Sequence, residues 1–189
     1  MSAAAAVPEP RPFETADQVD ANVFIGGYIA ASDPNFIRRM GITRIVKMFG
    51  DDKSYPGGYH RHRGVAYAVF PALDVPGYDI RGDAVNALRF IKEGLDADER
   101  ILVHCHAGIS RSSTVVLLYL MLLRGYDLDA ALALLRGVRP IVNPNAGFMR
   151  HLRATDDSLR RIRAGRALRA PAPRRPGWVF AEPQDSTPL

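Results

Sequence analysis

A cysteine and an arginine lie six positions apart in the segment ILVHCHAGISRSS, residues 101–113. The segment begins with a short apolar run and leads into a long one, which predicts a strand ending at Cys105 and a helix beginning at Arg111. A turn of this length can curl into a cup in which backbone N–H groups and the helix N-terminus face an anion. The pattern therefore predicts a binding site for a phosphate dianion.

Three residues of this loop have types that suit phosphate chemistry. Gly108 allows the tight backbone curl, and Arg111 offers two parallel N–H donors to two phosphoryl oxygens, which Lys cannot do. Cys105 would lie beneath the phosphorus, where oriented N–H donors favour the nucleophilic thiolate. A lone cysteine on an apolar strand is otherwise most often a buried structural thiol. The joint pattern of His-Cys, five residues and Arg-Ser favours the reactive interpretation.

The segment HCHAGISRSS resembles the phosphate-binding signature of the protein tyrosine phosphatase superfamily, and its compact setting resembles the dual-specificity protein phosphatase branch. STVVLLYLM, residues 113–121, and RPIVNPNAGFMRHL, residues 139–152, resemble further landmarks of that branch, with His151 where many relatives have Gln. The resemblance covers residues 20–155. It implies a hydrolase that acts on phosphotyrosine, and on phosphoserine and phosphothreonine, through a phosphocysteine intermediate.

The resemblance also implies a general acid on a separate loop. FPALDVPGYDI, residues 70–80, resembles that loop, and Asp74 follows a predicted strand that should end beside the cup. Asp74 is therefore the expected acid, because it can protonate the leaving oxygen. Asp79 is the alternative, although its position is better explained as a helix cap.

Other site residues follow from the same resemblance. Ser112 would hydrogen-bond the cysteine sulfur, with helix capping as the alternative role. His104 would orient the loop, or would simply be a core histidine, and Asn145 would support the loop or begin a helix. The residues expected to contact the phosphate are His106, Ala107, Gly108, Ile109, Ser110 and Arg111.

No metal or other cofactor is expected. His60 and His62 could suggest a metal site together with His104 and His106, but no carboxylate or cysteine is placed to complete a ligand set. We interpret the first two as exposed loop histidines. Hydrolysis by a cysteine and an acid needs no metal.

Strands alternate with helices along the chain, which predicts an α/β domain with a central, mostly parallel sheet flanked by helices. The predicted strands are residues 22–26, 42–49, 65–73 and 101–105. The predicted helices are residues 34–40, 80–94, 111–123 and 128–135, and a last one opened by Asn143 and Pro144.

Local signals support several of these helices. Asp33, Asp79 and Asp127 are expected to cap three of them, and Gly41 and Gly125 to end two. The helix at residues 111–123 is apolar nearly all round and should be buried. The helix at residues 80–94 should bury one face, made of Val85, Leu88, Ile91 and Leu95.

The 189 residues suit one domain, which we place at residues 18–165 between a flexible arm, 1–17, and a tail rich in Arg and Pro, 166–189. Residues 150–175 contain nine Arg and two Asp and carry a net charge of +7, whereas the whole chain carries +5. The rest of the chain is therefore slightly negative. Such a segment can contact nucleic acid or acidic membranes. A solvated helix face is commoner, so no partner is assigned to this segment, and the partners expected for the domain are phosphorylated protein substrates.

The single cysteine fits a reducing compartment, which predicts a cytoplasmic or nuclear protein. The longest apolar run, residues 115–123, falls far short of the roughly 20 residues that span a bilayer, so no transmembrane segment is expected.

Alternative functions on the same loop are an RNA 5′-triphosphatase, a lipid phosphatase, or a phosphate-binding module without catalysis. The cup lacks the paired lysines of inositide-reading relatives, and Ala107 stands where RNA-directed relatives have His.

Overall fold

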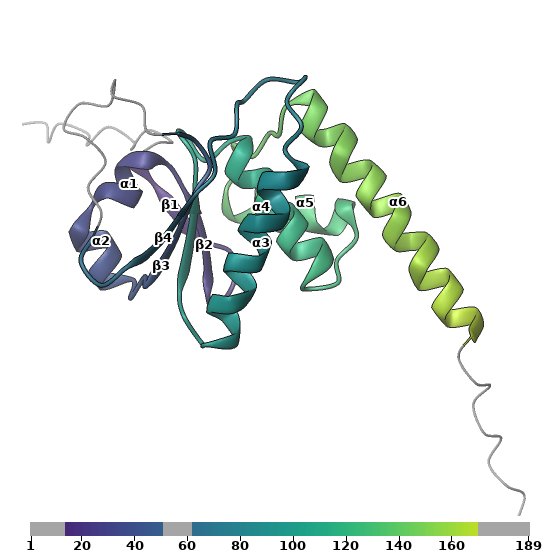
Figure 1. Cartoon of the computed structure of the whole chain (residues 1–189), viewed down its shortest axis with the longest axis horizontal. Helices are drawn as coiled ribbons and strands as arrows, with labels where there is room; N and C mark the ends of the chain where they lie inside the picture. The colour runs from purple at the N-terminus through teal and green to yellow at the C-terminus, as the bar shows by residue number, and fades with distance from the viewer. Residues whose placement is uncertain (1–13, 51–61, 170–189) are drawn as a thin grey trace, which may run out of the picture.

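The computed structural model describes residues 14–50 and 62–169, and its core is a five-stranded sheet in the order β1-β2-β5-β3-β4 (Figure 1). β1 pairs with β2 antiparallel, and all the other neighbouring strands are parallel, as predicted. The strands are β1 (Ala16–Gln18), β2 (Val23–Gly26), β3 (Arg44–Lys47), β4 (Ala66–Val69) and β5 (Ile101–His104).

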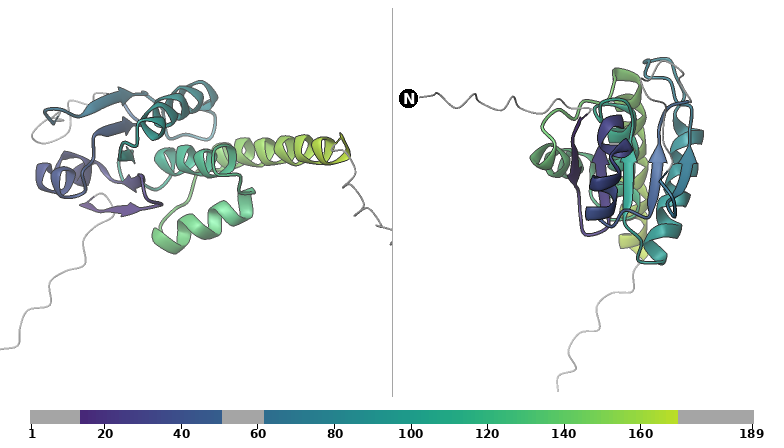
Figure 2. Two further views of the ribbon diagram at one scale, coloured as in Figure 1. Left: turned by 90° about the horizontal axis from the view of Figure 1, so that it is seen from below. Right: turned by 90° about the vertical axis from the view of Figure 1, so that its left-hand side faces the viewer.

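Helices cover both faces of the sheet (Figures 1 and 2). One face carries α1 (Tyr28–Ser32) and α2 (Pro34–Arg39), and the other carries α3 (Arg81–Asp96), α4 (Arg111–Leu122), α5 (Leu128–Val138) and α6 (Ala146–Arg169). Each face has its own apolar cluster. The sheet is thus the middle layer of an α/β domain, which places the carboxyl end of β5 beside the N-terminus of α4.

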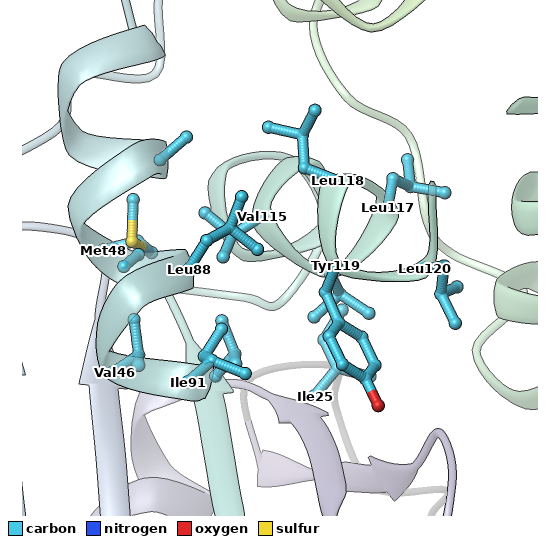
Figure 3. Close-up of a cluster of buried hydrophobic side chains, with 14 of the residues drawn as sticks. Ile25, Val46, Met48, Leu88, Ile91, Val115, Leu117, Leu118, Tyr119 and Leu120 are labelled. Atoms are coloured by element: carbon cyan, nitrogen blue, oxygen red, sulfur yellow. The ribbon is translucent and has the colours of Figure 1, made fainter. Parts of the chain in front are cut away.

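α4 lies at the centre of the larger cluster. Every residue from Ser112 to Met121 is buried, which confirms the prediction from its all-round apolar sequence. Figure 3 shows that its side chains pack against Leu88 and Ile91 of α3, Ile25 and Val46 of the sheet, and Met48, which follows β3. Full burial of each such side chain contributes roughly 1.5–3 kcal/mol. This packing holds the N-terminus of α4 rigidly against the end of β5.

Two predicted helix caps are confirmed. The Asp33 carboxylate accepts a hydrogen bond from the Asn35 N–H at 2.8 Å, and the Asp127 carboxylate accepts one from the Ala130 N–H at 2.8 Å. Asp79 lies one position before the N-cap of α3, and its carboxylate accepts from the Arg81 N–H at 3.1 Å. The cap is therefore displaced by one residue from its predicted position.

The last helix begins at Ala146, and the prediction that Asn143 and Pro144 open it was wrong. The Asn145 side chain caps it instead, because its Oδ1 accepts from the N–H groups of Gly147 at 3.0 Å and Phe148 at 3.1 Å. α6 continues to Arg169, beyond the domain end expected at residue 165, and extends past the body of the molecule (Figure 2).

Two short elements were not predicted, β1 and α1. They have three and five residues, too few for hydrophobic periodicity to reveal. β1 also includes residues 16 and 17, which were predicted to belong to the N-terminal arm.

On α3, Val85 was wrongly predicted to be buried and is 48% exposed. The helix instead buries the small residues Ala84 and Ala87 beside Leu88 and Ile91.

Among the helices that the structure describes, none combines the length and apolar character needed to cross a bilayer.

Candidate active site

The loop from Cys105 to Arg111 joins β5 to α4 at the carboxyl edge of the sheet. Gly108 within it has a φ of +71°, in the left-handed region that side chains disfavour. A Cβ at this position would also lie 2.7 Å from the Gly26 carbonyl oxygen and 2.8 Å from Arg139 Nη2. Glycine is thus required here by backbone conformation, as the sequence predicted, and also by close packing.

All five carbonyl groups from His106 to Ser110 accept hydrogen bonds from donors outside the stretch they span. In the order of the carbonyls, the donors are Tyr28 N at 3.0 Å, Arg139 Nη2 at 2.7 Å, Arg139 Nε at 2.9 Å, Asn143 N at 2.9 Å and Thr114 N at 2.9 Å. In a trans peptide unit the N–H points opposite to the C=O. The N–H groups of residues 107–111 therefore point to the other side of the loop.

These five N–H groups form the inner face of the loop. Within residues 14–50 and 62–169, no acceptor bonds to any of them. Buried backbone donors are nearly always paired, so a group of unpaired N–H donors pointing the same way is a strong indication of an anion site. The N-terminus of α4 adds its partial positive charge at the same place.

Cys105 is buried at the start of this loop, and two polar side chains contact it. The Ser112 hydroxyl donates to Cys105 Sγ at 3.2 Å. The Nδ1 of His104 lies 3.3 Å from the Cys105 carbonyl oxygen, so Nδ1 carries the proton. Burial lowers the pKa of His104 to about 3, and the ring is therefore neutral at physiological pH.

The loop of residues 105–111 is called the phosphate loop below. The Arg111 side chain lies between this loop and the segment that follows β4. Its Nη1 donates to the Ala72 carbonyl at 3.2 Å, and its guanidinium lies 5.8 Å from the Phe49 ring centroid. Its buried Nε is 3.6 Å from Asp74 Oδ2 and has no hydrogen-bond acceptor in the described part of the chain. The side chain is anchored at one nitrogen and keeps donors for an oxyanion.

Asp74 is held against the phosphate loop. Its Oδ1 accepts from Ser110 Oγ at 2.6 Å and from Asn145 Nδ2 at 2.9 Å, and the Asn145 N–H donates to Ser110 Oγ at 3.1 Å. The structure thus brings together Asp74, Asn145 and the adjacent pair Ser110 and Arg111 from three separate segments. Both hydrogen bonds go to Oδ1, so Oδ2 accepts none in the described part of the chain and lies 3.6 Å from Arg111 Nε.

The segment that carries Asp74 and Pro76 is also packed tightly on α6. A Cβ at Gly147 would lie 2.0 Å from the Pro76 carbonyl oxygen, and Arg150 Nη2 donates to that oxygen at 3.3 Å. Neither residue was identified as a site residue from the sequence. A glycine two residues after the Pro-Asn pair was the only local signal available.

Asp79, the alternative acid, has a different environment. Its side chain is 59% exposed, and both of its oxygens accept from the Arg81 guanidinium, at 2.8 and 2.6 Å. These hydrogen bonds lower the pKa of Asp79 to about 2. Within the described residues the Asp79 side chain bonds only Arg81, whereas Asp74 bonds Ser110 of the loop, so position favours Asp74 as the candidate acid.

The histidines considered as metal ligands are dispersed. The His106 ring stacks on Tyr28, with 5.1 Å between ring centroids, and His62 Nε2 hydrogen-bonds the Ala31 carbonyl at 2.9 Å. His62 is partly buried by this contact. His60 lies outside the described residues.

Residues 23–158 match the family model described as the dual specificity phosphatase catalytic domain. The chain belongs to the dual specificity phosphatase family. It is accordingly a cysteine-dependent protein phosphatase, a hydrolase of phosphoric monoesters. This confirms the resemblance found in the loop at residues 104–113, and the solved structures agree with the α/β fold expected from the alternation of strands and helices.

Curated relatives and solved structures agree with this family. The chain is 34% identical over 148 residues to dual specificity protein phosphatase 13B of Mus musculus, covering 77% of this chain and 74% of the relative. It is 35% identical over 151 residues to dual specificity protein phosphatase 26 of Rattus norvegicus, covering 77% and 69%. The crystal structure of human DUSP28 superposes with a TM-score of 0.69 at 28% identity, covering 82% of this chain and 99% of that one.

Proposed function

We propose that this phosphatase hydrolyses phosphotyrosine, and also phosphoserine and phosphothreonine, in proteins, with Cys105 as the nucleophile. The observation that carries the proposal is the set of five N–H groups, from residues 107–111, that face one side of a loop beginning at a buried cysteine. Such donors stabilise both the thiolate and the equatorial phosphoryl oxygens of the transition state.

In the first step Cys105 Sγ attacks phosphorus, the S–P bond forms, and the bond from phosphorus to the ester oxygen breaks. Asp74 Oδ2 gives its proton to the departing oxygen, while Arg111 and the loop N–H groups hold the phosphoryl oxygens. In the second step water attacks the phosphocysteine, and Asp74 takes the proton from this water. The Ser112 hydroxyl, 3.2 Å from the sulfur, stabilises the departing thiolate.

The roles of the remaining residues follow from their contacts. His104 orients the loop through the Cys105 carbonyl, and Asn145 and Ser110 hold Asp74 in place. Because the thiolate must be ionised and Asp74 protonated at the start, kcat/KM should follow a bell-shaped pH profile.

The relatives support the substrate class, since they are named dual specificity protein phosphatases. The cup residues His106, Ala107, Ile109 and Ser110 include no lysine, which does not favour an inositide substrate. A free thiol nucleophile must remain reduced, which supports a cytoplasmic or nuclear location.

The test is hydrolysis of p-nitrophenyl phosphate with a metal chelator present, followed by phosphotyrosyl and phosphoseryl peptides at equal enzyme. Cys105→Ser should abolish turnover and still bind tungstate, a tetrahedral oxyanion, because the N–H donors remain. Residual turnover in Cys105→Ser, or no activity in folded wild-type protein, would contradict the proposal. Faster hydrolysis of triphosphate-ended RNA or of an inositide than of any peptide would overturn the substrate class.

A further inference from the structure

A second arginine lies against the outer face of the phosphate loop. Arg139, at the end of α5, is only 2% exposed. Its Nε donates to the Gly108 carbonyl at 2.9 Å, and its Nη2 donates to the Ala107 carbonyl at 2.7 Å. One planar guanidinium therefore binds two consecutive carbonyl groups, a geometry that a single ammonium group cannot reproduce.

The third nitrogen of Arg139 binds the N-terminal strand. Nη1 donates to Asp17 Oδ2 at 2.5 Å and to Thr15 Oγ1 at 3.1 Å. A buried guanidinium without a counter-ion costs several kcal/mol, so the Asp17 carboxylate makes the burial of Arg139 possible. The chain is thereby connected from β1, through one side chain, to the backbone of the phosphate loop.

Close packing keeps these layers in contact. A Cβ at Gly26 on β2 would lie 2.5 Å from the Ala16 Cβ on β1, and a Cβ at Gly108 would lie 2.7 Å from the Gly26 carbonyl oxygen. The two glycines let strand β1, strand β2 and the loop approach each other directly. A displacement of β1 would therefore reach the loop both through packing and through Arg139.

We propose that Arg139 and Asp17 are a positioning pair for phosphate binding, which makes strand β1 part of the catalytic machinery. By holding the carbonyl groups of Ala107 and Gly108 outward, Arg139 turns the next two N–H groups, those of Gly108 and Ile109, toward the phosphate. The inference rests on the proposed role of this loop as a phosphate site. It adds two residues, 122 positions apart, that do not touch the substrate.

The first test is the tungstate affinity of Arg139→Lys, measured by calorimetry, with kcat and KM measured in parallel. Lys can satisfy one carbonyl at most, so tungstate binding should weaken by roughly 10- to 100-fold. Tungstate binding needs no turnover, so it tests the pair even if the proposed chemistry fails.

The matched control is Arg44→Lys. Arg44 also donates to a carboxylate, Glu99 Oε2 at 2.5 Å, and to a carbonyl, Phe90 O at 3.1 Å. Arg44 pairs with Ile101 at the start of β5, whereas His104 and the phosphate loop lie at the other end of that strand. Arg44→Lys should lower Tm and leave tungstate affinity unchanged. If Arg139→Lys behaves in the same way, Arg139 is only structural and the proposal is wrong.

The second test is Asp17→Asn, which also serves if Arg139→Lys does not fold. An Asn oxygen can still accept from Nη1, so the carbonyl contacts remain while the positive charge behind the loop loses its counter-ion. Removing this negative charge favours the Cys105 thiolate. The acidic limb of the pH profile of kcat/KM should therefore move to lower pH, by about 0.5 unit. A limb that stays in place or moves to higher pH would show that the Asp17 charge does not act on the loop, and Asp17 would then have no part in the pair beyond the hydrogen bond that Asn retains.

Discussion

The two faces of the phosphate loop each carry an arginine, and the two side chains differ in what satisfies their donors. On the outer face, all three nitrogens of Arg139 bind protein oxygens. On the inner face, Arg111 is anchored through Nη1, and its buried Nε has no acceptor in the described ranges. An arginine whose donors are all used by the protein stabilises structure, whereas one with spare donors beside an array of N–H groups is suited to bind a ligand.

The largest effect is expected from Asp74→Asn, on the inner face. The amide can keep the contact with Ser110 but cannot act as an acid, so hydrolysis of esters with poor leaving groups should slow by about 10² to 10⁴. Hydrolysis of p-nitrophenyl phosphate should slow much less, because its leaving group needs little protonation. Comparing kcat for phenyl and p-nitrophenyl phosphate measures this difference. Equal slowing of both esters, together with a selective loss in Asp79→Asn, would move the acid to Asp79.

Arg111→Lys tests the inner arginine directly. A point charge replaces the planar fork, so kcat/KM should fall by about 10² to 10³ and tungstate binding should weaken. Tm should change little, because among the described residues the Arg111 side chain makes one hydrogen bond, to the Ala72 carbonyl. Arg139→Lys should lower both tungstate affinity and Tm. If the two variants lost stability equally, the distinction between the two faces would fail.

Ser112→Ala is expected to have a smaller effect. Removing the hydroxyl that donates to Cys105 Sγ should slow turnover, and alkylation by iodoacetamide at pH 6, by roughly 10-fold. Ser113→Ala is the control, because Ser113 Oγ makes only a long contact of 3.4 Å to the outer-facing Gly108 carbonyl. Equal alkylation rates in wild type and Ser112→Ala would rule out this role for Ser112.

The smallest effect concerns stability rather than rate. The folded-state pKa of His104 is about 3 and the ordinary value is 6.5, so the unfolded chain binds this proton more readily. The stabilisation is complete above pH 6.5 and is lost as pH falls toward 3, with about 2 kcal/mol lost at pH 5. Urea unfolding at pH 7 and pH 5 should show a smaller pH dependence in His104→Asn than in wild type. Identical pH dependences would contradict the neutral, buried ring.

Local chemistry explains why much of this molecule was predictable. The strand before Cys105, the buried helix after Arg111 and the caps at Asp33 and Asp127 depend on residues within a few positions of each other. Their hydrophobic periodicity and side-chain donors and acceptors are visible in the sequence. Strand β1 was missed because three residues, paired to the sheet only through Val23–Gly26, give no such signal.

The residues around the phosphate loop also divide into those that the local sequence could predict and those that only the tertiary structure brings together. Cys105, Gly108 and Arg111 are close in sequence, and the demands of a tight, anion-binding turn were enough to select them, whereas the role of Ser112 was expected from the family resemblance. The pairing of Asp74 with Ser110 and Asn145, and of Arg139 with Asp17, joins segments 36 to 122 positions apart. Only the folded chain decides such contacts, because burial and hydrogen-bond partners across distant segments depend on how the layers pack.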